Sequence, residues 1–153
     1  MDIEIIKEQE RAMQFNRFDN NTAIDIGLKL LEAARDRKYP VTIDITRCRH
    51  QLFHASLPGT TSANDEWIRR KVNSVYRFET SSLILQLNTE KSGRTFQDQY
   101  FVDPDDYVAA GGSFPVRVIN TGFVGTITVS GMTSQEDHNL IIEVLKSYLK
   151  IED

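Results

Sequence analysis

The sequence contains little cysteine and no long apolar run. Of its 153 residues one is cysteine, Cys48, so no disulfide can form within the chain and a reducing compartment is expected. No apolar stretch approaches the roughly 18 residues that a membrane-spanning helix needs. The first residues, MDIEIIKEQERAM, carry charges throughout and lack the apolar centre of a signal peptide. We therefore expect a cytoplasmic protein without a membrane segment.

An excess of basic residues is also missing. Lys and Arg number 18 against 22 Asp and Glu, which gives a formal net charge of −4. No broad basic surface is then available to neutralise phosphates, so nucleic-acid binding is not expected. Neither a linker nor an internal repeat interrupts the chain. Residues 1–153 are expected to form a single domain, long enough to bury a core without metal or disulfide support.

The sequence shows no close-spaced set of metal ligands and no catalytic triad. Three histidines and one cysteine do not have the spacing of a structural zinc site. No Ser–His–Asp or Cys–His order is evident. Whether the protein has any catalytic activity is therefore left open.

Hydrophobic periodicity predicts most of the elements in the first half of the chain. The stretch VTIDIT alternates apolar and polar residues, as in a half-buried strand. QLFHASL follows after a short turn, so the two strands are expected to form a hairpin. Helices are predicted over residues 2–15, from the caps in DNNT to about residue 37, and in EWIRRKVNSVYRF, where Ser62 or Asn64 can provide the cap.

Two segments in the middle of the chain are harder to assign. SSLILQLNTEKSG fits a strand by its alternating leucines and a helix by Leu83, Ile84 and Leu87, and its own pattern does not decide between them. VDPDDYVAAGG predicts a short helix that Asp103 caps and that ends at the two glycines.

Glycine-marked strands lead into the last helix. FPVRVI and FVGTITVS predict strands joined by the turn NTG, where Gly122 can take a positive φ. Ser134 and Asp137 match a capping box for the helix that follows. The order of all these elements predicts an α+β domain in which helices flank an antiparallel sheet.

The second half also resembles a known family. Gly111-Gly112, Pro115, Gly125, Ser130-Gly131 and Glu136-Asp137 together resemble the C-terminal signature of the HbpS/GlcG-like superfamily, whose members include haem-binding proteins. LFHASLPGTTSANDEWIRRKVNSVYRF and His138 resemble its branch labelled haem-degrading-domain-like, which consists of small, largely uncharacterised proteins. The resemblance covers most of residues 20–150. It implies a profilin-like, three-layer α/β/α sandwich, a helix at residues 81–90, and symmetric oligomers.

Two histidines are candidate ligands of haem iron, if haem binds. His138 lies in the first turn of the last helix, where the helix dipole favours the neutral imidazole that ligates metals, although Glu136 and Asp137 oppose this effect. A hydrogen bond from His138 to its own helix cap is an equally good interpretation. His54 lies on a strand, where a half-buried histidine with satisfied hydrogen bonds is the more common case.

A group of anion-binding residues is predicted around the helix that begins near residue 62. The PGTT loop can present hydroxyl and N–H groups, and Arg70 or Lys71 can supply a positive charge. Alternatively, Glu66 pairs with Arg70, and Asp65 with Arg69, four residues along the helix. The residues expected to border one cleft, within a subunit or across an interface, are Thr60, Thr61, Arg70, Lys71, Gly112, Ser113 and His138.

Two functions agree with these features. In the first, the protein binds haem or a related tetrapyrrole and degrades it if it is an enzyme. In the second, it is a non-enzymatic oligomeric module that binds a small anionic metabolite or a protein partner. A homo-oligomer, at least a dimer, is expected in either case, with the N-terminal helix or the last helix at the interface.

Overall fold

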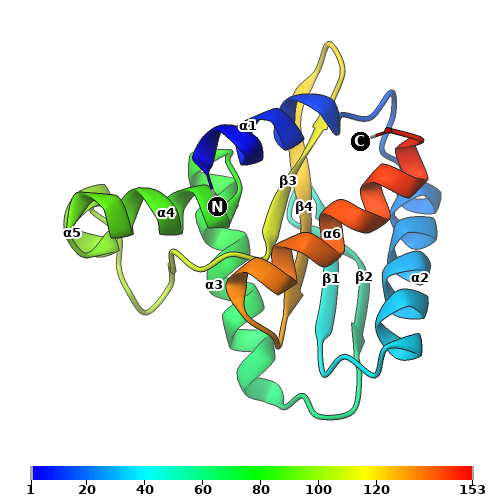
Figure 1. Cartoon of the computed structure of the whole chain (residues 1–153), viewed down its shortest axis with the longest axis horizontal. Helices are drawn as coiled ribbons and strands as arrows, with labels where there is room; N and C mark the ends of the chain where they lie inside the picture. The colour runs from blue at the N-terminus through cyan, green and yellow to red at the C-terminus, as the bar shows by residue number, and fades with distance from the viewer. Residues whose placement is uncertain (1, 153) are drawn as a thin grey trace.

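The structure is a four-stranded antiparallel sheet with six helices, the α+β fold predicted (Figure 1). It is a computed structural model that describes residues 2–152. None of the helices in this range is both long and apolar enough to cross a membrane. The elements are α1 (Ile3–Ala12), α2 (Asn20–Asp36), β1 (Thr42–Arg47), β2 (His50–Ser56), α3 (Ser62–Phe78), α4 (Ser82–Ser92), α5 (Phe96–Tyr100), β3 (Ser113–Val118), β4 (Gly122–Ser130) and α6 (Ser134–Leu149).

The sheet is built from two hairpins that meet in its centre. Its strand order is β2-β1-β4-β3, so the expected pairs β1–β2 and β3–β4 both form, and β1 also pairs with β4. Gly122 takes the predicted positive φ, +105°, where the second hairpin turns. Ile43 lies opposite Val129 and Ile45 opposite Ile127, and these side chains form the main core with α2 and α6.

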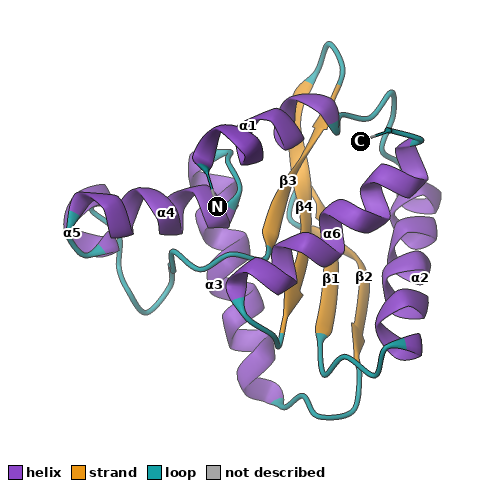
Figure 2. Ribbon diagram, viewed as in Figure 1, coloured by secondary structure: helices purple, strands orange, loops and turns teal. Residues whose placement is uncertain are grey.

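Helices cover both faces of the sheet (Figure 2). α2 and α6 pack on one face, and α3 crosses the other, so the molecule has the expected three layers. The prediction that β1 is half-buried was wrong, because α3 also covers Thr42, Asp44 and Thr46. The Thr46 hydroxyl lies 2.7 Å from the Tyr76 hydroxyl of α3, which satisfies its buried polar group.

Threonines cap the two helices that flank the candidate site. Thr61, and neither Ser62 nor Asn64, is the N-cap of α3. Thr133 is the N-cap of α6, and its partner in the capping box is Glu136, so the predicted Ser134–Asp137 box was wrong. Because the N-cap of α6 is Thr133 and not Ser134, Glu136 takes the role in the capping box that was predicted for Asp137. The Asp137 side chain can therefore make a tertiary contact.

The helix predicted in VDPDDYVAAGG does not form beyond one turn. Asp103 does accept a hydrogen bond from the N–H of Asp105, but the residues after this turn form neither helix nor strand up to β3. α3 satisfies the backbone groups of this segment instead. Ser74 Oγ donates to the Val108 carbonyl and accepts from the Val108 N–H, and the Asn73 amide donates to the Asp106 carbonyl. The helix in this region is the shorter α5, which begins after Thr95.

Residues 81–90 are helical, as the family resemblance implied. α4 is buried on opposite sides: Leu83 and Ile84 pack with Ile6 of α1, while Leu85 packs with Phe96 of α5. A helix buried on two sides has no single apolar stripe, which explains why its pattern also fitted a strand.

Candidate functional site

A pocket of about 320 Å³ lies where α3, the end of β4 and the start of α6 meet, and we call it the Lys71 pocket. The α3 residues that pack on the sheet include Ile68, Val72 and Val75, and Lys71 falls on the same side of the helix. Its side chain is thereby buried, yet it borders a cavity. The lining residues are Asn64, Trp67, Lys71, Ala110, Ser130, Gly131, Met132, Ser134 and Asp137.

The amine of Lys71 is held by two acceptors. Lys71 is 3% exposed, and its Nζ donates to the Val129 carbonyl at 3.0 Å and to Asp137 Oδ2 at 3.3 Å. Burial lowers the pKa of Lys71, and the nearby Asp137 carboxylate opposes this shift. A protonated amine has three N–H donors, so one remains for a molecule in the pocket.

Asp137, the partner of Lys71 in a buried ion pair, is itself held by the backbone. Its Oδ1 accepts a hydrogen bond from the backbone N–H of Met132 at 3.0 Å, so the carboxylate joins the loop after β4 to α3. Burial raises the pKa of Asp137, and Lys71 opposes this shift. Burial therefore favours the neutral form of both partners, while their mutual attraction favours the charged forms.

Two helices begin at the pocket. Asn64 lies in the first turn of α3, and Ser134 is the first residue of α6. The N-terminus of a helix carries a partial positive charge of roughly half a unit. Lys71 and Asp137 cancel in formal charge, and Asp65 and Glu136 in the first turns of α3 and α6 oppose the partial charges of the helix ends, so the third N–H of Lys71 is the main donor of the pocket. This arrangement suits the carboxylate or the polar carbonyl of a small molecule.

Two of the residues predicted to bind an anion meet at this pocket. Lys71 lines it, and Gly112 packs directly behind the amine: a Cβ atom at Gly112 would lie 2.6 Å from Lys71 Nζ. Arg70 lies at the rim, where its guanidinium stacks over the ring of Trp67 at 4.5 Å. Glu66 pairs with Arg69, so the alternative pairing of Glu66 with Arg70 does not occur.

The hydroxyl groups predicted to bind a ligand are used within the fold. Thr60 Oγ1 donates to the Leu57 carbonyl, and Thr61 Oγ1 caps α3 by accepting from the N–H of Ala63. The Ser113 hydroxyl lies 2.8 Å from that of Thr128, and both are buried. His138 is fully buried in the subunit, and none of Thr61, Arg70 and His138 lines the Lys71 pocket, so a cleft common to all three stays a prediction.

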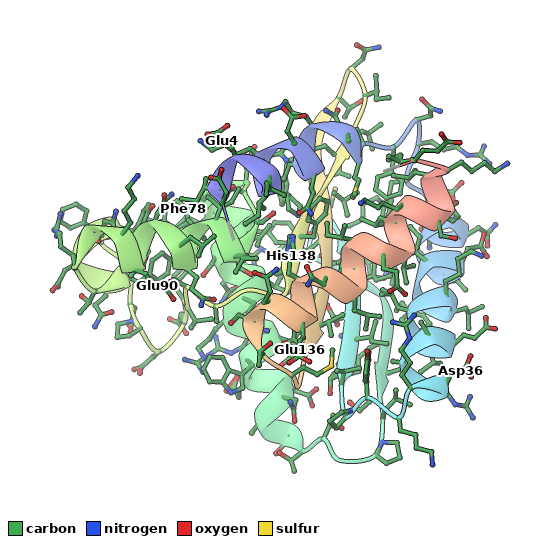
Figure 3. The ribbon with its side chains drawn as sticks, viewed as in Figure 1. Glu4, Asp36, Phe78, Glu90, Glu136 and His138 are labelled. Carbon is green, nitrogen blue, oxygen red and sulfur yellow. The ribbon has the colours of Figure 1, made fainter. Side chains whose placement is uncertain are left out.

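His138, labelled in Figure 3 near the beginning of α6, is fully buried and does not line the Lys71 pocket. Its Nε2 lies 2.7 Å from Gln9 Oε1 of α1, and its Nδ1 has no hydrogen-bond partner. Burial lowers its pKa to about 4, so the imidazole is neutral as expected. The cause is desolvation rather than the helix dipole, and the hydrogen bond reaches α1 rather than the cap of α6.

His54 is occupied by acidic side chains. Its Nδ1 lies 3.0 Å from Asp44 Oδ1 and its Nε2 lies 3.3 Å from Asp65 Oδ1. No group of three or more His, Cys, Asp and Glu residues suited to a metal ion occurs in the described part of the chain. Within one chain His138 is fully buried, and both ring nitrogens of the partly exposed His54 lie close to carboxylate oxygens.

Asp137 is the principal site residue that the sequence did not single out. It was interpreted as part of a helix cap, whereas it is the partner of Lys71. One signal was available: Lys71 shares the apolar side of α3, and a lysine buried there needs an acidic partner. Nothing local identified Asp137, since 66 positions separate the two residues.

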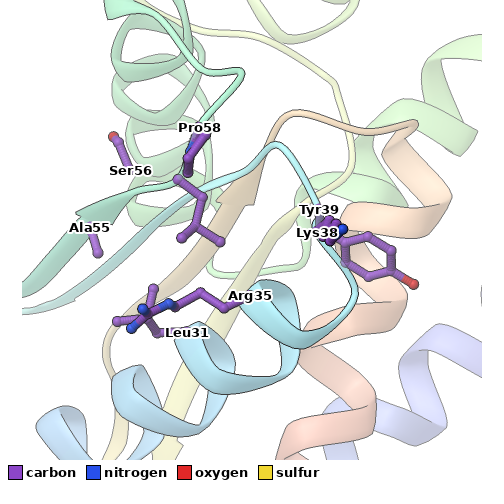
Figure 4. A pocket seen from close by; sticks show the side chains of 8 residues that line it. Leu31, Arg35, Lys38, Tyr39, Ala55, Ser56 and Pro58 are labelled. Atoms are coloured by element: carbon purple, nitrogen blue, oxygen red, sulfur yellow. The ribbon is translucent and has the colours of Figure 1, made fainter.

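A second concave region, which we call the α2–β2 cleft, lies beside the edge strand β2 and has a volume of about 640 Å³ (Figure 4). Ala55 points towards Leu31 and Arg35 of α2 there, whereas the Ser56 side chain points away from them. Its remaining lining residues are Lys38, Tyr39, Leu57 and Pro58. The cleft contains none of the predicted site residues.

Comparison with known proteins agrees with the fold and with the family resemblance. A family model described as haem degrading protein HbpS-like matches residues 18–146. The UPF0303 protein SCO2848 of Streptomyces coelicolor is 46% identical over 144 residues, which cover 94% of this chain and 91% of that protein. The crystal structure of the Ybr137w protein has a TM-score of 0.90 and 26% identity, covering 98% of this chain and 88% of the other. A structure described as a PduOC:heme complex has a TM-score of 0.66 and 15% identity over 80% of this chain and 88% of the other.

Proposed function

Because the chain belongs to the HbpS-like family, we propose that it is a ligand-binding protein and that the Lys71 pocket binds a small carboxylic acid. The observation that carries this proposal is the buried amine of Lys71 at the wall of an open pocket. Burying a lysine is costly, and a purely structural ion pair gains nothing from an adjoining cavity. The third N–H of Lys71 supplies a charged hydrogen-bond donor for a carboxylate, and the dipoles of α3 and α6, which both begin at the pocket, favour the same charge.

Trp67 provides a direct assay, because it is the one tryptophan of the chain and lines the pocket. We expect its fluorescence to change saturably on titration with one or more of acetate, pyruvate, succinate and citrate. Lys71→Met removes a charged hydrogen-bond donor, so binding should weaken about tenfold or more. Lys91→Met, at an exposed lysine of α4, is the matched control. No saturable change with any of the four acids, and no heat of binding by calorimetry, would contradict the proposal.

Haem or a related tetrapyrrole is the second candidate ligand, supported by the family description and by the heme complex of a structural neighbour. The two predicted iron ligands do not fit this role in one chain, since His138 is buried and His54 is held between Asp44 and Asp65. We therefore expect a haemin titration to give no Soret band typical of histidine ligation. A saturable shift at one haem per chain that His138→Ala or His54→Ala abolishes would favour haem instead.

We also propose that the protein is a cytoplasmic homo-oligomer. The exposed thiol of Cys48 supports a reducing compartment. Ile24 and Leu28 on the outer side of α2 are exposed, and they lie on the helix that borders the α2–β2 cleft. This apolar surface on α2 supports self-association through that helix.

A further inference from the structure

We propose that Lys71 is a nucleophilic amine that forms a Schiff base with the carbonyl group of a 2-oxo acid bound in the Lys71 pocket. The inference rests on the proposed function, because the acid must first bind there. Of the lysines that the structure describes, Lys71 is the one that is buried, and it borders a cavity. Its immediate neighbours are arranged to hold an amine and to move a proton.

The amine is fixed in position before any ligand enters. The Val129 carbonyl accepts one of its hydrogens at 3.0 Å. Gly112 allows the backbone to approach closely from behind, since any side chain there would collide with Nζ. A lysine held in this way loses little rotamer freedom when it reacts, in contrast to an exposed lysine on a flexible stem.

Asp137 lies in the position of a proton acceptor. Its Oδ2 is 3.3 Å from Lys71 Nζ, and Met132 fixes its other oxygen. Attack on a carbonyl needs the neutral amine, and the low polarity around the pair favours proton transfer from Lys71 to Asp137. Removing a lysine from water in this way favours its neutral amine, which is the form that reacts with carbonyl compounds.

The reaction balances with the residues present. The lone pair of Nζ forms a bond to the carbonyl carbon, and the proton on Asp137 passes to the carbonyl oxygen, giving a carbinolamine. Asp137 then takes one of the two protons on the nitrogen and returns it to the hydroxyl group, which leaves as water while the nitrogen lone pair forms the C=N bond. The product is a protonated imine that links the ligand to Nζ beside the Asp137 carboxylate, with no oxidant or reductant consumed.

The surroundings favour a 2-oxo acid over a simple aldehyde. A carboxylate next to the reacting carbonyl can face the N-terminal ends of α3 and α6, which begin on either side of the pocket. The cavity of about 320 Å³ limits the ligand to a small molecule. Trp67 forms an apolar wall against which the rest of such a molecule can pack.

Reductive trapping tests the inference. The protein is incubated with pyruvate or glyoxylate and sodium cyanoborohydride, and the adduct is located by intact mass and peptide mapping. We expect one adduct per chain, at Lys71, formed at pyruvate concentrations where the exposed Lys91 is unmodified. Lys71→Arg keeps a positive charge but cannot form the imine, and should abolish the adduct. Asp137→Asn should slow its formation by about a hundredfold, the usual contribution of a general acid–base.

The outcomes separate this inference from the proposed function. Saturable pyruvate binding by Trp67 fluorescence without an adduct at Lys71 would overturn the Schiff base and leave the binding site standing. Failure of both binding and trapping would remove both proposals. Equal labelling of Lys71 and Lys91, unchanged in Asp137→Asn, would show only nonspecific amine reactivity and would also overturn the inference.

Discussion

Gly112 shows how one residue without a side chain makes the Lys71 pocket possible. Its φ is +125°, and a Cβ atom there would lie 2.5 Å from the Val129 carbonyl oxygen and 2.6 Å from Lys71 Nζ. The Val129 carbonyl belongs to the backbone of a strand, and two hydrogen bonds hold the Lys71 amine. Neither neighbour can therefore move away easily. The glycine is needed both for its conformation and for the space it leaves to the amine.

We expect Gly112→Ala to destabilise the protein more than Gly122→Ala. Both residues have a positive φ, but nothing lies within 4 Å of a Cβ atom at Gly122. The control therefore reports backbone strain, and the difference reports the collisions with the Val129 carbonyl and the Lys71 amine. The free energy of unfolding in denaturant should differ by about 1–3 kcal/mol between the two variants. Equal losses of unfolding free energy in the two variants would mean that the structure accommodates the added Cβ atom at position 112 without cost.

The buried imidazole of His138 makes stability depend on pH. Burial lowers its pKa from 6.5 to about 4, so the folded protein stays neutral at this residue where the unfolded chain gains a proton. The free energy of unfolding should therefore be unaffected above about pH 6.5 and should fall by about 3 kcal/mol in total as the pH drops to 4. In His138→Gln, which cannot be protonated, urea titrations should show a smaller loss over this range. An identical loss in variant and parent would contradict the assignment.

At the level of elements, Glu10 attaches α1 to two distant parts of the chain. Its Oε1 accepts from Arg117 of β3 at 2.9 Å, and its Oε2 accepts from the hydroxyl and the N–H of Ser81 before α4. Because Gln9 of the same helix lies 2.7 Å from His138 Nε2, α1 also contacts the first part of α6. Polar contacts thus hold α1 in place in addition to the packing of Ile6 against α4.

We expect Glu10→Ala to loosen α1 while the sheet stays protected. Leaving Ser81 and Arg117 without their acceptor should cost about 1–3 kcal/mol. Hydrogen exchange measured by mass spectrometry should show faster exchange over Ile3–Ala12 and unchanged exchange in β1 and β4. The control is Glu8→Ala, which breaks an exposed pair with Arg11 and should change little. Uniformly faster exchange in every element would show that α1 is not a separate unit.

For the whole molecule, the exposed apolar residues distinguish between possible interfaces. Leu28 on α2 and Ile5 on α1 are each 52% exposed, so a glutamate at either position is tolerated equally well by the subunit. If self-association uses α2, Leu28→Glu should shift the mass measured by light scattering towards the monomer, and Ile5→Glu should not. The opposite result would place the interface on α1, the N-terminal helix suggested by the sequence. A monomeric parent protein at micromolar concentration would contradict self-association through either helix.

The sequence by itself determined the local elements and their order. Alternation in residues 41–46, the glycine turn at residue 122 and the helical spacing of Leu140, Ile141, Val144 and Leu145 reflect which side chains must leave water, and such patterns are local. They correctly predicted both hairpins and the helix that packs on the sheet. The cationic side of α3 was also visible in the sequence.

Tertiary structure alone decided the features that depend on contacts between distant residues. α3 satisfies the backbone of residues 106–108 and thereby removes a helix for which the local signals were favourable. It also buries the polar side of β1, and it brings Lys71 to Asp137 across 66 positions. Such contacts depend on how the layers stack, which no periodicity within a single element can encode. The sequence therefore contained every residue of the pocket, and the packing of α3 and the start of α6 around the end of β4 selected which of them meet.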